Sequence, residues 1–323
     1  MMYTENLNYK KLIEEFLSFK RSCGYKYFSE ENILKAFYND TQKYKDSSLG
    51  LSKEFLKIWS MPGVKEGRKS LSNRVSVIRE LGIYLNNQGY KVHILRSVKN
   101  ATNKSFIPYV FSEKEMEKIF LTIDTWKQSK HNRYNSNQVY PILFRMLYGC
   151  GLRISEALDL KIKNVDTESG KVIVDVAKNN KQRIVMMSDS LKKICHKYKY
   201  TYLLHVDNES TFFQHRDGKI RSKNQVNNFF RQILYKSDIP YLGRGKGPYL
   251  HNLRHTFACH TFYQMSKNGI DMNVGITLVS SYLGHESPQT TERYLKLTQE
   301  IFPELMLKIT DYSSDVYREV VYE

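Results

Sequence analysis

Apolar residues recur at helical spacing through the first hundred positions. In NLNYKKLIEEFLSFKRSCGY they fall at 12, 13, 16 and 17, and Gly24 ends the run. Further helical patterns cover SEENILKAFYNDTQKY, SKEFLKIWS and about 68–88, and no strand-like alternation interrupts them. The pattern therefore predicts an all-helical first domain over residues 1–98, built from four or so helices.

The helical pattern stops in SVKNATNKSFIPYV, a polar and basic stretch that contains a proline near its end. This composition is typical of an extended connection, so we assign residues 99–110 to a linker. Helical periodicity resumes in FSEKEMEKIFLTI, where Ser112 and Glu115 have the spacing of a capping box. A second domain is predicted from there, over residues 111–323.

The hydrophobic period changes from helical to alternating inside this second domain. Val172, Val174 and Val176 alternate with polar residues, and QRIVMM follows a turn predicted at Asn179-Asn180. This pattern predicts a β-hairpin or a three-stranded sheet. Helical patterns then return at about 188–204, 222–236, 251–267, 273–283 and 287–298. The predicted fold class is mainly α with a small antiparallel β-sheet.

Charge adds information about the partner. The 323 residues include 50 Lys and Arg against 33 Asp and Glu, which gives a formal net charge of +17. An excess of this size favours a polyanionic partner, and nucleic acid is the usual one. The alternative is a basic surface that binds nothing.

Cysteine usage and hydropathy exclude other classes. The 4 cysteines are scattered without a C-x-x-C pair, so neither a zinc knuckle nor a disulfide framework is indicated. A reduced, cytoplasmic location is expected. No run approaches the roughly 20 apolar residues that span a bilayer, so we expect no membrane segment and no secretory signal.

The segment HNLRHTFACH carries the first candidate chemistry. His251 and Arg254 are three positions apart and share a helix face, where they could cradle a phosphate. The His251–His255 spacing resembles a metalloprotease motif, but that motif needs a glutamate where Asn252 stands. We interpret His255 and His260 as packing or surface residues.

Two further basic residues follow predicted turns. In GCGLRISEALDL, Arg153 comes directly after a glycine turn, and Glu156 is placed one helical turn later to orient it. Lys178 lies at the predicted hairpin tip. Each residue alone is also compatible with an ordinary solvated side chain.

The segment SSYLGHESPQTTERYLKLT supplies a histidine and a tyrosine. Ser287-Pro288 has the pattern of a helix start, a cap followed by the first helical position. His285 precedes it, and Tyr294 lies two turns into the helix. Taken alone, Tyr294 reads as a core aromatic.

The order Arg, Lys, His-x-x-Arg, Gly-His, Tyr resembles the tyrosine recombinases, also called phage integrases, which include the Xer recombinases. The resemblance covers about 108–300, and the first domain resembles the helical, SAM-like core-binding domain of that family. It implies six catalytic residues, with the tyrosine as nucleophile, the first histidine as the acceptor of its proton and the lysine as general acid: Arg153, Lys178, His251, Arg254, His285 and Tyr294. Relatives often have Gly-Lys-Gly-Asn-Lys at the hairpin turn, whereas this chain has AKNNK, so Lys181 stays a second candidate for the lysine.

The resemblance implies a site-specific DNA recombinase that forms a 3′-phosphotyrosine intermediate, needs no divalent cofactor and acts as a tetramer on double-stranded DNA. We expect it to serve a mobile genetic element. Xer-like dimer resolution or DNA inversion, a topoisomerase-like activity and a catalytically inactive DNA-binding accessory protein are the alternatives. Accessory recombination factors stay open as further partners.

Both domains are expected to contact DNA through basic residues of the first domain and the linker. The candidates are Arg68, Lys69, Arg74, Arg79, Lys99 and Lys104. The apolar segment IFPELMLKI after Tyr294 predicts a short helix that packs either on its own chain or on a neighbouring subunit.

Overall fold

The computed structural model describes residues 9–43, 51–64, 66–98, 108–126, 136–175, 182–243, 247–285 and 289–302. The chain folds into two compact units, Met1–Phe106 and Ile107–Glu323. Each unit has its own buried core. The proposed linker 99–110 lies largely outside the described residues, including Lys99 and Lys104.

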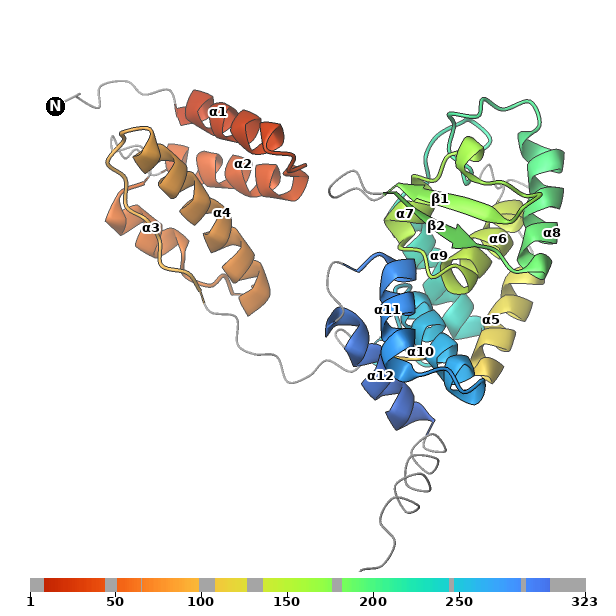
Figure 1. Ribbon diagram of the computed structural model, residues 1–323. Helices are drawn as coiled ribbons and strands as arrows, with labels where there is room; N and C mark the ends of the chain where they lie inside the picture. The colour runs from red at the N-terminus through yellow and green to blue at the C-terminus, as the bar shows by residue number, and fades with distance from the viewer. Residues whose placement is uncertain are drawn as a thin grey trace, which may run out of the picture. The chain divides into compact units, whose positions relative to one another are not determined.

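The described part of the first unit is helical, as the sequence pattern predicts (Figure 1). Its helices are α1 (Tyr9–Ser22), α2 (Phe28–Lys43), α3 (Lys53–Trp59) and α4 (Arg68–Asn87). Phe16, Leu34, Phe37 and Leu56 are fully buried where their apolar faces meet. Burying a side chain of this size contributes about 1.5–3 kcal/mol each, so the unit has a core of its own.

Arg74 of α4, one of the predicted DNA contacts, binds groups of its own unit. Its Nε and Nη2 bond the Glu66 carboxylate, Nη1 bonds the carbonyl of Trp59, and its guanidinium lies 4.2 Å from the Trp59 ring centroid. These contacts fix α4 to the end of α3. By contrast, Arg68 and Lys69 are exposed at the start of α4, and Arg79 is half-buried.

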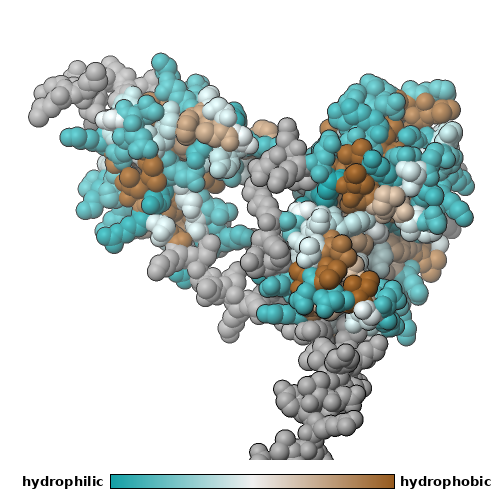
Figure 2. Space-filling model, in the orientation of Figure 1, coloured by the Kyte–Doolittle hydropathy of each residue, from teal (hydrophilic) through white to brown (hydrophobic). Residues whose placement is uncertain are grey.

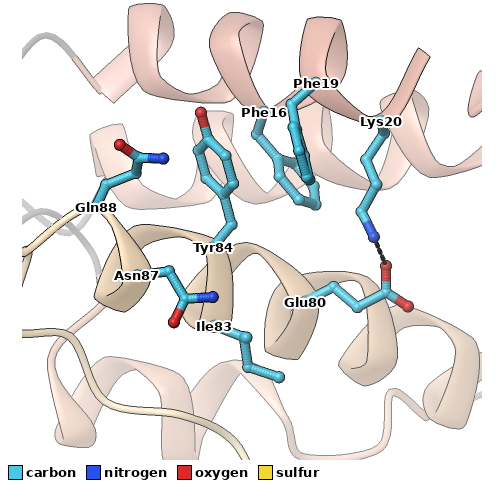
Figure 3. Close-up of a pocket in the computed structure, with 8 residues that line it drawn as sticks. All are labelled: Phe16, Phe19, Lys20, Glu80, Ile83, Tyr84, Asn87 and Gln88. Carbon is cyan, nitrogen blue, oxygen red and sulfur yellow. Dashed lines mark ion pairs between the residues drawn. The ribbon is translucent and has the colours of Figure 1, made fainter. Parts of the chain in front are cut away.

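A groove in the first unit lies between α1 and α4. It is lined mainly by aromatic and aliphatic groups, including Phe19, Ile83 and Tyr84, and Lys20 pairs with Glu80 at 2.7 Å along its edge (Figure 3). The candidate catalytic residues belong to the second unit, so this groove is not part of their site.

The second unit is also mainly helical. Its described helices are α5 (Glu113–Asp124), α6 (Ser136–Gly149), α7 (Ile154–Leu158), α8 (Asp189–Tyr198), α9 (Lys223–Lys236), α10 (Asn252–Lys267), α11 (Met272–Leu283) and α12 (Gln289–Ile301). A short 3₁₀ turn covers Ile162–Asn164, and α8 continues as a π-helical turn over Lys199–Leu203. Phe111, Phe144 and Phe230 are central to the core.

Helix α6 is not among the predicted helices, although it lies at the centre of this core. Pro141 falls inside it, a residue that normally argues against a helix interior. Its buried neighbours Val139, Leu143, Phe144 and Met146 show that tertiary packing outweighs the local signal. The predicted capping box, in contrast, is confirmed: Ser112 Oγ accepts from the Glu115 amide, and the Glu115 carboxylate accepts from the Ser112 amide.

The predicted sheet is present as two antiparallel strands, β1 (Lys171–Asp175) and β2 (Gln182–Met186). Val172 pairs with Val185, and Ile173 with Ile184. Val172, Val174 and Val185 are buried, which confirms the alternation read from the sequence. The mainly helical fold with a small antiparallel sheet is therefore confirmed. The hairpin turn lies outside the described residues, with Val176, Lys178 and Lys181.

Helices α10, α11 and α12 pack together into a second core within this unit (Figure 1). Phe262 of α10, Leu283 of α11 and Leu297 of α12 are buried there. Helix α11 also contacts β2, and α10 contacts α6. This packing brings residues from the hairpin, the glycine turn and the last helix to one place.

Figure 2 shows hydrophilic residues over much of the visible face of both units, with apolar patches between them. Within the described parts of the chain, no helix combines the length and the apolar character needed to cross a bilayer.

Candidate active site

The glycine turn before α7 positions Arg153. Gly151 has a φ of +59°, and a Cβ there would lie 2.6 Å from Phe257 Cδ1, so only glycine fits. Arg153 then caps α7, and its backbone N–H donates to Glu156 Oε2 at 2.8 Å. Its guanidinium donates to Glu156 Oε1 at 2.7 Å and remains partly exposed. The sequence prediction that Glu156 orients Arg153 agrees with this geometry.

Arg254 is fixed more firmly. It is 1% exposed, and it donates from Nη1 to the Gly151 carbonyl and from Nη2 to the Leu283 carbonyl, both at 2.7 Å. Burial, and after it the nearby charge of Arg153, lower its pKa to about 9. At neutral pH the group still carries its charge. It therefore ties the glycine turn to the end of α11 and presents a desolvated cation beside Arg153.

Arg183 of β2 is part of this cluster and was not predicted. Its Nη1 and Nη2 donate to the two oxygens of Glu156 at 3.0 and 2.8 Å, and its Nε donates to the Tyr282 carbonyl at 2.9 Å. Burial alone would raise the pKa of Glu156, but the hydrogen bonds and charge of Arg183, then Arg153, outweigh it and lower that pKa to about 2. Glu156 thus stays ionised in a pocket that holds three guanidinium groups.

The charge count of this cluster favours an anionic ligand. Arg153, Arg183 and Arg254 contribute three positive charges and Glu156 one negative charge, which leaves two in excess. Because Arg183 binds both oxygens of Glu156, that carboxylate is already paired. Arg153 and Arg254 can therefore direct their remaining N–H donors to the oxygens of a phosphate.

His285 and Tyr294 complete the pocket from α11 and α12. Gly284 ends α11 in the left-handed conformation, at φ +64°, and directs the chain so that His285 follows. His285 Nδ1 hydrogen-bonds Thr291 Oγ1 at 2.8 Å, and its ring stacks 5.9 Å from that of Tyr294. Burial, then Arg254 and Arg153, lower the pKa of His285 to about 4, so the imidazole is neutral at pH 7.

Tyr294 is 4% exposed, and its hydroxyl lies 2.9 Å from His255 Nδ1. Burial raises the pKa of Tyr294, while the charges of Arg254 and Arg153 oppose that rise. The hydroxyl is therefore protonated at rest and sits inside the field of the two guanidinium groups. This places Tyr294 in the same pocket as the residues predicted to accompany it.

The three histidines at and within α10 have different environments. His251 is the N-cap residue of α10 and is exposed. Its ring lies edge-on to that of His255, with 4.6 Å between the ring centroids. Desolvation by the pocket, then Arg254 and Arg153, lower the pKa of His251 to about 4. His255, interpreted from sequence as a packing or surface residue, instead touches the Tyr294 hydroxyl. His260 does pack, against Tyr148, whose hydroxyl lies 2.9 Å from its Nδ1.

Five of the six predicted catalytic residues therefore lie in one connected cluster of side chains in the described structure. The sixth, Lys178, lies outside the described residues, as do its alternative Lys181 and the predicted helix start at Ser287-Pro288. Within the described residues no group of His, Cys, Asp and Glu side chains is arranged to hold a metal ion.

Comparison with known proteins agrees with this arrangement. The model of the phage integrase family matches residues 110–300, more than half of the chain. The chain belongs to the phage integrase family. Members of this family are tyrosine-type site-specific recombinases, and that is the enzyme class of this chain.

Xer recombinases are among its similar relatives. The tyrosine recombinase XerA of Pyrococcus horikoshii is 25% identical over 95% of this chain and 96% of its own length. XerA of Thermococcus onnurineus is 30% identical over 69% of this chain and 70% of its own length. The match to the first of these extends through the helical first unit.

Solved structures share the fold. XerH recombinase bound to its difH substrate has a TM-score of 0.61 at 19% identity, and covers 87% of this chain and 77% of its own. A λ integrase tetramer bound to a Holliday junction has a TM-score of 0.61 at 14% identity, over 90% of this chain and 78% of its own. At these identities the likeness establishes the fold alone.

Proposed function

We propose that this chain cleaves and rejoins DNA at specific sites through a covalent 3′-phosphotyrosine formed by Tyr294. The supporting observation is that Arg153, Arg254, His251 and His285 lie in one cluster of contacts around Tyr294, which comes from the last described helix. A phosphodiester is an anion, and attack on it concentrates further negative charge on the non-bridging oxygens. Two fixed guanidinium groups match that charge.

The clamp stabilises the transition state because its donors are fixed in advance. Arg254 is held by two carbonyl oxygens and Arg153 by Glu156, so little reorganisation is needed when the phosphate arrives. Loss of one preorganised donor of this kind typically costs about 3–4 kcal/mol of barrier. His251 and His285 are placed to donate to the same oxygens. Cationic side chains thereby take the role that a metal ion has in other phosphoryl transfer sites.

The covalent step needs one proton acceptor and one proton donor. The oxygen of Tyr294 bonds to phosphorus and gives up its proton to a neighbouring base, and the bond from phosphorus to the 5′-oxygen breaks. Lys178, or Lys181 as its alternative, protonates the leaving 5′-oxygen. The product is a 3′-phosphotyrosine and a free 5′-hydroxyl. Because the phosphotyrosine bond conserves the phosphodiester energy, a 5′-hydroxyl from another duplex can reverse the step without ATP.

Exchange between two duplexes needs four such sites, so we propose a tetramer on DNA, in which the units 1–98 and 111–323 both contact the duplex. The λ integrase tetramer bound to a Holliday junction supports this assembly by its shared fold. We further propose that the substrate belongs to a mobile genetic element. The Tn1549 transposon integrase, with a TM-score of 0.57 at 14% identity, is one relative of that kind.

Xer-type resolution of chromosome or plasmid dimers is the second candidate, because the XerA relative matches nearly the full length of both chains. Plasmids carrying two copies of the recovered site distinguish the roles. Resolution predicts efficient deletion between direct repeats. Integration of an element predicts joining of two different sites, one from the element and one from its target.

A suicide substrate tests the covalent step. DNA sites are first selected by binding of the full chain to fragmented genomic DNA, and a nicked duplex is then built so that the cleaved end diffuses away. The wild type should form a protein–DNA adduct that survives denaturation, Tyr294→Phe should form none, and Tyr235→Phe, at an exposed tyrosine, should match the wild type. An adduct that persists in Tyr294→Phe would refute the nucleophile.

Two other outcomes identify the competing activities. A wild type that binds its selected site yet forms no adduct would favour the accessory role. Adduct formation with relaxation of supercoils, but without exchange between two labelled duplexes, would favour a topoisomerase-like activity.

A further inference from the structure

The hydroxyl of Tyr294 meets a histidine that the sequence pattern did not single out. His255 Nδ1 lies 2.9 Å from that hydroxyl, and the two ring centroids are 5.3 Å apart. His251, the histidine to which the family motif assigns an active-site role, is in ring contact with His255. The residue in direct hydrogen-bonding contact with the nucleophilic oxygen is therefore His255.

Helix α10 holds Tyr294 at two points one turn apart. His255 binds the hydroxyl, and the thiol of Cys259 lies 3.8 Å from the Tyr294 backbone carbonyl. Thr298, one turn beyond Tyr294, donates its hydroxyl to that same carbonyl at 2.7 Å. Arg254, directly before His255, is anchored by two backbone carbonyls. His255 is thus carried by a rigid segment, and its contact with the hydroxyl is a built feature of the fold.

The charge state of His255 suits a proton acceptor. Burial, and after it the groups that face the ring, together lower its pKa to about 3: these groups are His251 and Arg254 around the start of α10, His285 after α11, and Arg293 on α12. The imidazole is therefore neutral, and a neutral imidazole carries one nitrogen with a free lone pair. With the proton on Nε2, Nδ1 can accept the hydrogen bond of the Tyr294 hydroxyl.

We infer that His255 is a catalytic residue that holds the Tyr294 hydroxyl and accepts its proton during attack on phosphorus. This inference rests on the proposed function. The proton moves from the tyrosine oxygen to Nδ1 of His255, the oxygen forms its bond to phosphorus, and the 5′-oxygen leaves with a proton from the general acid. In the rejoining step the 5′-hydroxyl attacks phosphorus and gives its proton to the deprotonated general acid, the bond from phosphorus to the tyrosine oxygen breaks, and His255 returns the proton to that oxygen.

The surrounding charge links this transfer to DNA binding. An imidazolium at His255 would face the positive charges of Arg254 and Arg293, which disfavour it. A phosphodiester bound between Arg153 and Arg254 adds a negative charge and offsets that repulsion. The nucleophile is therefore activated when the scissile phosphate is in place, and it stays protonated otherwise.

A matched pair of variants tests the assignment. His255→Asn and His251→Asn each remove an imidazole while leaving a polar side chain. Single-turnover cleavage of the nicked substrate is measured over a range of pH, together with DNA affinity. We expect His255→Asn to bind DNA as the wild type does and to cleave about 10²–10³-fold more slowly, in line with the loss of a general base.

Replacing Tyr294 by a fluorotyrosine separates a proton acceptor from a structural contact. A fluorinated phenol is more acidic, so it needs a base less. The gain in cleavage rate on replacing tyrosine by fluorotyrosine should be at least about tenfold larger in His255→Asn than in the wild type. In His251→Asn it should give no such relative gain, because His251 donates to the phosphate.

The outcomes divide cleanly. The inference would be overturned if His255→Asn cleaved at the wild-type rate. It would also be overturned if only His251→Asn gained from fluorotyrosine, because His251 would then be the proton acceptor. A slow His255→Asn without any fluorotyrosine gain would reduce His255 to a positioning residue and would also overturn it. If His255→Asn loses DNA affinity through misfolding, His255→Gln serves as the second variant under the same criteria. An absence of adduct in the wild type would instead refute the proposed function itself.

Discussion

The side chain of Arg254 matters to the site through the geometry of its guanidinium group, and not through its positive charge alone. That group joins two backbone carbonyls from separate segments, Gly151 and Leu283, while facing the position proposed for the phosphate. An ammonium is a compact point charge without the planar fork that makes these contacts together. A buried arginine is thus used here both as a structural tie and as an anion ligand.

Replacing Arg254 by lysine should therefore reduce single-turnover cleavage by about 10²–10³-fold although the charge is kept. DNA affinity should change little, since most of it comes from other phosphate contacts. The control is Arg231→Lys at an exposed arginine of α9, which should cleave at the wild-type rate. Near-normal cleavage by Arg254→Lys would show that charge suffices and that the two carbonyl contacts are dispensable.

The side chain of Arg183 joins three elements that are separate in sequence. From β2 it reaches Glu156 in α7 and the Tyr282 carbonyl near the end of α11, and a Cβ on Gly284 would lie 3.0 Å from its Cδ. Strand β2 is thereby connected to the turn that carries His285.

Arg183→Ala should destabilise the second unit by about 3–5 kcal/mol, because it leaves the buried Glu156 carboxylate without its bidentate partner. Urea unfolding of the full chain measures the loss, and Arg216→Ala, at an exposed arginine of the same unit, is the control. Arg183→Lys should recover only part of the stability, because one ammonium cannot pair with both oxygens and the Tyr282 carbonyl. Equal unfolding of Arg183→Ala and Arg216→Ala would contradict this account.

The elements themselves were largely predictable from local pattern, and their connections were not. The alternation of Val172 and Val174 and the capping box at Ser112 both appear as predicted, since each depends on residues close in sequence. Helix α6 was missed because Pro141 argues locally against it. The order of the motif identified Arg153 and Tyr294. The roles of Arg183 and His255 depend on contacts across 27 and 39 positions, which a local pattern cannot encode.

The half-buried histidines around Tyr294 make the stability of the folded chain depend on pH. His255 and His285 have pKa values of about 3 and 4 in the folded chain, below the value of about 6.5 for a free imidazole. Between these values the unfolded chain binds more protons than the folded chain. The contribution of these neutral histidines to the free energy of unfolding is therefore fully present above about pH 6.5, and it is lost as the pH drops toward 4. Glu156, whose folded pKa is about 2, contributes a further loss only below about pH 4.5.

Urea unfolding of the full chain between pH 7 and pH 5 should reveal this loss, with a slope of up to about 1.4 kcal/mol per pH unit for each proton taken up. His255→Asn should show a smaller slope over the same range, since one of the titrating groups is gone. An unchanged slope in that variant would mean that His255 titrates normally in the folded chain and is not desolvated by the pocket.

The net charge of +17 predicts that DNA affinity falls steeply with salt, and the structure divides the basic residues of α4 into two kinds. Arg68 and Lys69 are exposed and available to phosphates, whereas Arg74 is committed to Glu66 and Trp59. Each lost phosphate contact should lower the slope of log affinity against log salt by ~0.9, so a double Arg68→Ala, Lys69→Ala variant should lose up to ~1.8.

Arg74→Ala is the matched control in the same helix, and it should keep the wild-type salt slope while lowering the melting temperature of the first unit. The reason is that its removal leaves the Glu66 carboxylate and the Trp59 carbonyl without their common donor. Fluorescence anisotropy on the selected site at several salt concentrations measures the slope. A different result would be a salt slope lowered as much as in the double variant, with an unchanged melting temperature. Arg74 would then exchange its intramolecular partners for phosphates when DNA binds, as predicted from the sequence.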